Sequence, residues 1–141
     1  MSPEKFFTLR ERYPKIFVPS EYQSEPIDAV GIECGNGWFD VIDSLCSSLQ
    51  KYVDRRLTAG VATEDLQPRA VQVKEKFGGL RFYVSGGDEV VDEMIALVES
   101  HSTKVCETCG SRGRQHTTAG WIRTSCDPCL ENHTRRRSAE G

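Results

Sequence analysis

Four cysteines near the C-terminal end of the chain form the clearest chemical pattern in the sequence. Cys106 and Cys109 make one C-x-x-C pair, Cys126 and Cys129 make a second, and sixteen residues separate the pairs. Two thiolates at this short spacing can turn toward one cation, and a second pair completes the tetrahedral sulfur cage that a structural Zn2+ prefers. The pattern therefore predicts a four-cysteine zinc site.

The same region argues against zinc-based catalysis. A catalytic zinc keeps an open coordination position, whereas four cysteines fill the shell. Zinc deaminases need an H-x-E element and then P-C-x-x-C, but Pro128 lies inside the second pair and no matching H-x-E exists. His116 and His133 could each replace a cysteine ligand, and the alternative is that both are surface side chains. We expect a structural zinc and no catalytic residue.

The cysteines also bear on the compartment. The apolar stretch near the N-terminus is too short for a secretion signal, and no apolar run is long enough to cross a membrane. Six cysteines in such a chain indicate a reducing compartment, so we expect a cytoplasmic protein with thiols rather than disulfides. Cys46 falls on an apolar helical stripe and is expected in the core. Cys34 lies in a glycine-rich loop, and its role stays open.

Helical segments precede the cysteines. Apolar residues recur at intervals of three and four over residues 38–57, which predicts an amphipathic helix, and a second stripe predicts a helix over residues 89–102 with Asp88 as its cap. Ser2 and Pro3 are typical of a helix start. Residues 29–34 alternate weakly and predict a short strand.

Residues 70–85 are predicted to form a β-hairpin. Gly78-Gly79 supplies the positive φ angles that a two-residue turn requires. With this turn, one face of the hairpin is apolar apart from Glu75, which could pair with an arginine of the first helix or of the cysteine region. The other face is basic and aromatic.

The basic face of the hairpin is a candidate binding surface, formed by Lys74, Lys76, Arg81 and Tyr83. The predicted turn places Lys76 opposite Arg81 and Lys74 opposite Tyr83. Like charges directly opposite each other repel, and a phosphate backbone, a nucleotide or an acidic protein patch would relieve this repulsion. The alternative is a solvated face whose charges nearby glutamates neutralise.

Positive charge is concentrated around the cysteines. Residues 1–103 carry 11 basic and 17 acidic side chains, whereas residues 104–141 carry 7 basic and 4 acidic ones. Arg112, Arg114 and Arg123 therefore join the candidate binding surface, although arginines also keep a zinc knuckle soluble. The whole chain has a net charge of -3 and no strongly basic recognition helix, so a protein partner or a nucleotide ligand is preferred to duplex DNA.

Together these features predict an α+β fold, in which a small antiparallel sheet packs against helices and a C-terminal zinc ribbon or knuckle follows. We expect residues 1–103 to form the α+β core, residues 104–134 the four-cysteine module, and residues 135–141 a basic, disordered tail. Within the module, Trp121 and Ile122 are expected to lie in a strand, and residues 130–134 in a short helix.

Three blocks of the sequence resemble a known group of proteins: GIECGNGWFDVIDSLCSSL at 31–49, VQVKEKFGGLRFYVS at 71–85 and CETCGSRGRQHTTAGWIRTSCDPC at 106–129. They resemble small phage- and prophage-borne bacterial proteins without an assigned function. The resemblance implies a zinc-binding, cytoplasmic accessory protein of mobile elements. By analogy, such a protein acts by binding a host or defence protein, a nucleotide signal or nucleic acid, and the resemblance implies no catalytic residues.

CETCG and CDPCLENHTRRR also resemble the zinc knuckles of HNH-type endonucleases. Those enzymes carry a ββα catalytic unit with a histidine base, whereas only sixteen residues, with His116 as their one histidine, separate the cysteine pairs here. We expect too little chain for that unit. The sequence thus predicts a non-enzymatic, zinc-stabilised binding protein, with a nucleic-acid-binding protein or an HNH-like nuclease as the alternative. Homo-oligomers are possible if the exposed hairpin edge pairs with a second copy.

Overall fold

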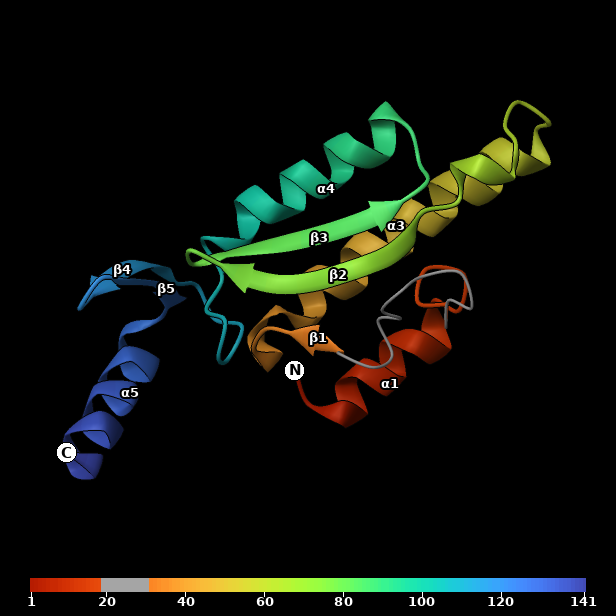
Figure 1. Ribbon diagram of the computed structural model, residues 1–141. Helices are drawn as coiled ribbons and strands as arrows, with labels where there is room; N and C mark the ends of the chain where they lie inside the picture. The colour runs from red at the N-terminus through yellow and green to blue at the C-terminus, as the bar shows by residue number, and fades with distance from the viewer. Residues whose placement is uncertain (19–30) are drawn as a thin grey trace.

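The protein has a small sheet packed against helices, as the α+β prediction requires (Figure 1). The structure is a computed structural model that describes residues 1–18 and 31–141. β1 (Ile32–Glu33) pairs parallel to β2 (Arg69–Lys76), which pairs antiparallel to β3 (Gly79–Ser85). The sheet is therefore mixed and only its hairpin is antiparallel. Of the strand expected over 29–34, Ile32–Glu33 is confirmed, and residues 29 and 30 lie outside the described ranges.

Three helices surround this sheet: α1 (Pro3–Arg12), α3 (Phe39–Thr58) and α4 (Glu89–Ser102). The helix starts agree with the predicted caps, because Ser2 Oγ accepts the Lys5 N–H and Asp88 Oδ1 accepts the Val91 N–H. α3 runs behind the sheet in Figure 1, and α4 lies along β3. Short 3-10 turns, η1 (Asn36–Trp38) and η2 (Glu64–Leu66), precede α3 and β2.

One apolar cluster joins the helices to the sheet. The predicted stripe of α3 is buried at Ile42, Leu45, Cys46, Leu49 and Val53. From the sheet, Val73, Leu80 and Phe82 enter the same cluster, so the predicted apolar face of the hairpin is confirmed. Burial of such side chains is the main stabilising term in a domain of this size.

The turn of the β2–β3 hairpin lies one residue earlier than predicted. Phe77 and Gly78, with φ of 53° and 77°, occupy the two central positions, and Lys76 pairs with Gly79. Positive φ at both positions is typical of a type I′ turn. Glu75 Oε1 accepts the Gly78 N–H at 2.8 Å, which holds the turn in this place. Glu75 thus supports the turn, and no ion pair is recorded for it within the described residues.

The pairings predicted on the basic face are therefore wrong. Lys74, rather than Lys76, lies opposite Arg81, and Tyr83 lies opposite Gln72. Each predicted partner is displaced by two residues along the strand. Because side chains alternate with a period of two, this slip leaves the paired residues 73–76 and 80–83 on their predicted faces. A register shift at the start of β2 breaks the alternation, so that Ala70 is buried and Val71 is exposed.

The outer edge of β3 is occupied by α4. Ser102 Oγ accepts the Leu80 N–H and Glu99 Oε1 accepts the Phe82 N–H, both at 2.9 Å. These donors would otherwise be open to pairing with another strand. At Leu80 and Phe82 this edge of the hairpin is therefore covered by α4 rather than exposed.

The cysteine module forms a second hairpin, β4 (Arg114–Thr118) and β5 (Trp121–Ser125). β5 confirms the strand expected at Trp121 and Ile122, whereas β4 was not predicted. Its turn again contains a residue pair with positive φ, Ala119 at 50° and Gly120 at 81°. The sixteen residues between the cysteine pairs therefore accommodate two strands, and the helix that follows begins within the second pair.

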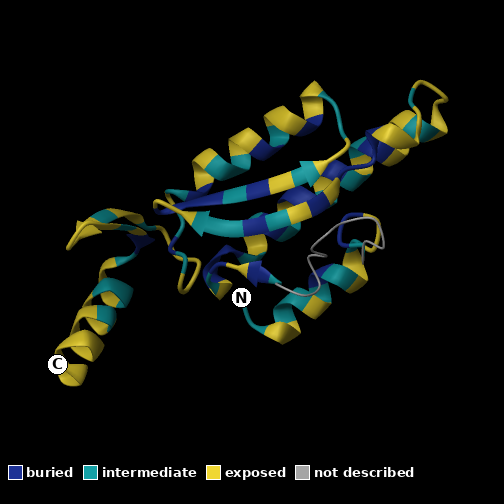
Figure 2. Cartoon of the chain, in the orientation of Figure 1, coloured by how far each residue is buried: buried dark blue, intermediate teal, exposed yellow. Residues whose placement is uncertain are grey.

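α5 (Asp127–Glu140) follows the second hairpin and is longer than expected. It begins directly after Cys126, and Pro128 in its first turn needs no intrahelical N–H bond. It continues through residues 135–140, which were expected to be disordered. None of its residues is buried, and Figure 2 shows it extending away from the rest of the molecule.

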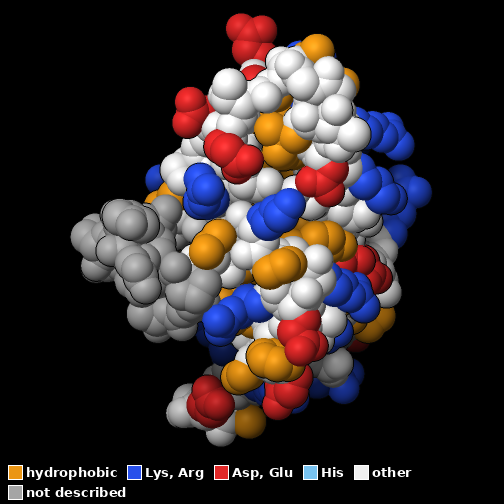
Figure 3. Space-filling model, turned by 90° about the vertical axis from the view of Figure 1, so that its right-hand side faces the viewer, with side chains coloured by type: hydrophobic (Ala, Val, Ile, Leu, Met, Phe, Trp, Pro, Cys, Tyr) orange, Lys and Arg blue, Asp and Glu red, His pale blue; other side chains and the backbone are white. Residues whose placement is uncertain are grey.

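Charge is mixed on the end of the molecule opposite the cysteine module. Figure 3 shows lysine and arginine interspersed there with acidic and hydrophobic side chains. In the sequence, basic side chains outnumber acidic ones in residues 104–141. Among the described residues, no helix combines the length and the apolar character needed to cross a membrane.

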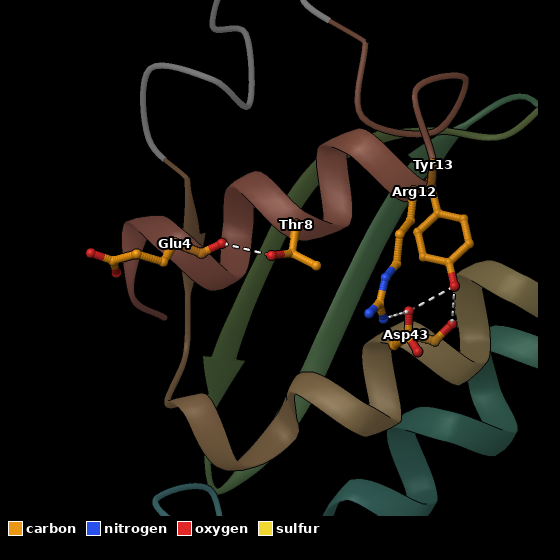
Figure 4. A network of polar contacts seen from close by, with 5 residues as sticks. All are labelled: Glu4, Thr8, Arg12, Tyr13 and Asp43. Atoms are coloured by element: carbon orange, nitrogen blue, oxygen red, sulfur yellow. Dashed lines mark hydrogen bonds and ion pairs between the residues drawn. The ribbon is translucent and has the colours of Figure 1, made fainter.

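A polar contact attaches α1 to α3 (Figure 4). The Tyr13 hydroxyl lies 2.7 Å from Asp43 Oδ1 and 3.0 Å from the Asp43 carbonyl oxygen, and Arg12 donates to the same carboxylate at 3.0 Å. Burial and the hydrogen bond to Asp43 raise the pKa of Tyr13 to about 12. The neutral hydroxyl is thus favoured in the folded chain.

Replacing Tyr13 by Phe is expected to lower stability by about 1–2 kcal/mol at neutral pH, because a hydrogen bond to a charged group is lost. The raised pKa of Tyr13 means that this stabilisation is intact below the unfolded pKa, about 10, and is lost as the pH rises toward about 12. Urea unfolding at rising pH measures the difference. The control variant Tyr83→Phe, at an exposed ring, should lose stability at alkaline pH as the unchanged protein does. If Tyr13→Phe lost as much stability at alkaline pH as the control, the role given to Tyr13 would be contradicted.

Candidate metal centre

The four predicted ligands meet at one point. The sulfur atoms of Cys106, Cys109, Cys126 and Cys129 all lie within 4.8 Å of one another, and Cys109 Sγ is 3.7 Å from Cys126 Sγ. A tetrahedral zinc with Zn–S bonds of about 2.3 Å separates its sulfurs by about 3.8 Å. A disulfide would need about 2.0 Å, and all six cysteines are free thiols. The donor set and its spacing fit a Zn2+ ion.

The thiols influence one another's ionisation. Hydrogen bonds from Ser111 lower the pKa of Cys109 to about 6, whereas the neighbouring Cys126 and burial raise the pKa of Cys129 to about 12. Closely spaced thiols therefore resist losing all their protons together. A divalent cation reverses this, because it stabilises every thiolate bound to it.

Backbone geometry forms the first knuckle. Gly110 has a φ of 83°, and its N–H donates to the Cys106 carbonyl at 2.8 Å. The Cys106 N–H in turn donates to Ser111 O at 2.7 Å. Cys106 is buried and Cys109 is exposed, so one ligand of this pair faces the protein and the other faces solvent.

The glycine-rich loop before α3 packs directly on this knuckle. The Gly37 N–H donates to Glu107 O at 2.8 Å, the Gly35 N–H donates to Glu107 Oε1 at 3.0 Å, and Trp38 Nε1 donates to Val105 O at 2.8 Å. We refer to these contacts between residues 35–38 and 105–110 as the loop interface. Trp38 is fully buried, and its indole also anchors the module.

The tip of the β2–β3 hairpin makes a second attachment. Thr124 Oγ1 donates to Gly78 O, and Gln115 Nε2 donates to Phe77 O at 3.3 Å. A Cβ atom on Gly78 would lie 2.9 Å from Ile122. These contacts between residues 77–78 and the β4–β5 hairpin form the tip interface. The two interfaces bring together all three sequence blocks noted above.

Neither nearby histidine belongs to the metal cluster. The cysteines are the only group of possible ligands that the described residues bring together. His116 Nε2 lies 3.1 Å from Ser125 O, so this nitrogen carries the proton and donates it. His133 lies on α5, where Arg123 and then partial burial lower its pKa.

The predicted hairpin surface is assembled only in part. The Lys74 ammonium lies 6.0 Å from the centre of the Tyr83 ring, and Arg81 donates to Leu80 O at 2.9 Å. Lys76 is exposed at the strand end, where its ammonium lies 5.7 Å from the Phe77 ring centre. These residues share one side of the sheet, but they form no enclosed site.

The three module arginines have different surroundings. Arg114 forms an ion pair with Asp127 at 3.2 Å on the exposed surface, and such a pair contributes little to folding stability. Arg112 is exposed beside the first knuckle, and its backbone forms an isolated antiparallel β-bridge with Val105. Arg123 lies on β5 and lines a hollow beside α5. Arg123 is therefore the member of the predicted set that lines these hollows.

Cys34 and Cys46, the other two cysteines, are core residues. Both are buried, and burial raises the pKa of the Cys34 thiol to about 12. Neither is close enough to the cluster to join it. The expectation for Cys46 is confirmed, and Cys34 packs with the same apolar residues.

Comparisons of the chain with protein-family models, with curated proteins and with solved structures found no match.

Sequence reasoning missed the residues that attach the module. Glu107, Thr124 and Gln115 look like ordinary polar surface positions in the sequence. The available signal was the glycine at position 37, which directly precedes a bulky tryptophan. A Cβ atom there would lie 2.1 Å from Cys106 O and 2.6 Å from Glu107 O.

Gly37→Ala is therefore expected to destabilise the protein by at least about 2 kcal/mol, because the added methyl meets backbone that cannot move aside. Urea unfolding measures this change. Gly79→Ala is the matched control, since its added carbon meets first the flexible Arg81 side chain at 3.1 Å. Equal stability of the two variants would contradict the loop interface.

Proposed function

We propose that the protein is a non-enzymatic binding protein in which a structural Zn2+ holds a C-terminal module rigidly against the α+β core. The observation that carries this proposal is the convergence of four sulfur atoms on one point. Four thiolates occupy every corner of a tetrahedral shell and leave no position for a substrate. The ion then serves to order the knuckle that the loop interface needs.

The partner we propose is a host or defence protein, or a nucleotide ligand, as the resemblance to phage-borne proteins implies. The hairpin surface supports an anionic partner. Lys74 lies directly opposite Arg81, and no acidic side chain is recorded as an ion-pair partner of either one within the described residues. An acidic group seated between them would remove the repulsion.

An HNH-like nuclease is the second candidate. The order β4–β5–α5 favours it, because those enzymes carry a ββα unit beside their knuckles. His116 would be the catalytic base. A second metal would need ligands beyond the cysteines, and the described residues group none.

Plasmid DNA incubated with the zinc-loaded protein and Mg2+ or Mn2+ separates the two candidates. We expect no nicking. Cleavage that His116→Ala abolishes would establish the nuclease and overturn the proposal.

Capture of partners by the tagged full chain tests binding directly, with mass analysis of retained proteins and small molecules. We expect a retained component that Lys74→Glu combined with Arg81→Glu releases, because the charge of the surface reverses. Lys51→Glu, at an exposed position on α3, should retain it. If the two preparations retain the same molecules, the hairpin surface has no binding role.

A further inference from the structure

An elongated groove runs between the β4–β5 hairpin and α5. Two adjoining hollows, of about 200 and 550 Å3, share Arg123, Leu130 and His133 in their walls. The larger hollow reaches Trp121 at the turn end of β5 and Arg137 on α5. We refer to the two together as the module groove.

The groove exists because the two faces of the second hairpin have different neighbours. Gln115, Ile122 and Thr124 lie on the face that meets the tip of β2–β3. His116 and Arg123 pair across the strands on the opposite face, which is turned toward α5. α5 presents residues at helical spacing to this face, yet none of them is buried. The space between is therefore open.

The residues that line the groove carry a net positive charge. No ion pair is recorded within the described residues for Arg123, Arg136 or Arg137, although all three line it. These arginines together lower the pKa of His133, with Arg123 as the largest cause. The one carboxylate in the walls, Glu107, already accepts the Gly35 N–H at 3.0 Å.

Two further side chains at the groove, Trp121 and Ser125, are available to a ligand. Trp121 is 71% exposed beside the groove, which is unusual for so large an apolar ring. At the inner end, Ser125 is 7% exposed, and its hydroxyl has no hydrogen-bond partner among the described residues. Buried hydroxyls nearly always have one, so this oxygen is free to bond a group that enters the groove.

We propose that the module groove binds single-stranded nucleic acid, with Arg123, Arg136 and Arg137 contacting phosphates and Trp121 stacking on a base. This inference rests on the proposed function only for the zinc-held module that carries the groove, and it adds a second site with a ligand of its own. Cationic grooves with exposed aromatic rings are the usual means of binding unpaired strands, because every base has a flat face. A duplex keeps those faces stacked internally. An acidic peptide would match the arginines but would leave Trp121 without a planar partner.

Fluorescence anisotropy with fluorescein-labelled oligo(dT) and oligo(U), added to the zinc-loaded full chain, tests the proposal. Three phosphate contacts on a single strand predict a slope of about -2 in the logarithm of affinity against the logarithm of salt concentration. Trp38 is fully buried, so quenching of the tryptophan emission would report Trp121 and should vanish in Trp121→Phe. Absence of binding to both oligonucleotides would overturn the proposal.

Groove variants locate the site. Trp121→Ala should weaken binding about tenfold or more through lost stacking, and Trp121→Phe should recover part of it. Arg123→Ala combined with Arg137→Ala should reduce the slope to about -0.7. Phe7→Ala and Arg55→Ala, at exposed positions on α1 and α3, are the matched controls and should change neither quantity.

Three results would contradict the inference: groove variants that bind like the controls, a duplex bound as tightly as the single strands, or a mononucleotide bound as tightly as the oligomers. Zinc content and far-UV spectra of each variant show whether it is folded. If the protein holds its zinc but binds no strand, the groove assignment fails while the structural role of the metal stands. If the zinc is absent, the proposed function fails first.

Discussion

The placement of the cysteine module depends on one close approach, in which the backbone of the first zinc knuckle lies directly on the glycine loop that precedes α3. Gly37 has no room for a Cβ atom, and its N–H, the Gly35 N–H and the Trp38 indole all donate to residues 105 and 107. Such contacts need a knuckle of fixed shape. A metal held by four thiolates provides that shape, because apolar burial in the module is slight.

This dependence explains why stretches that are far apart in the sequence contact the same module. The loop at 35–38 receives the knuckle, and the hairpin tip at 77–78 receives the second hairpin. With one face of β4–β5 used for attachment, the other is free to face α5. The module is thus held at two points on the core, and its groove lies between the β4–β5 hairpin and α5.

Local signals predicted much of the core. The spacing of apolar residues located α3 and α4, the caps at Ser2 and Asp88 were correct, and the cysteine spacing identified the cluster. The hairpin register was not predictable from alternation, because a slip of two residues preserves both faces. Nor was α5, whose polar sequence has no apolar stripe to mark its length. The groove was missed because it arises from the arrangement of two elements, not from a motif.

X-ray absorption at the zinc edge of the purified, zinc-loaded protein tests the central claim most directly. A closed tetrathiolate site predicts four sulfur ligands at about 2.3 Å and no lighter ligand in the first shell. Three sulfurs with a nitrogen or oxygen at about 2.0–2.1 Å would contradict it, because a histidine or a water molecule would then occupy one corner. In that case the metal would have an exchangeable position, and the case for a purely structural ion would be lost.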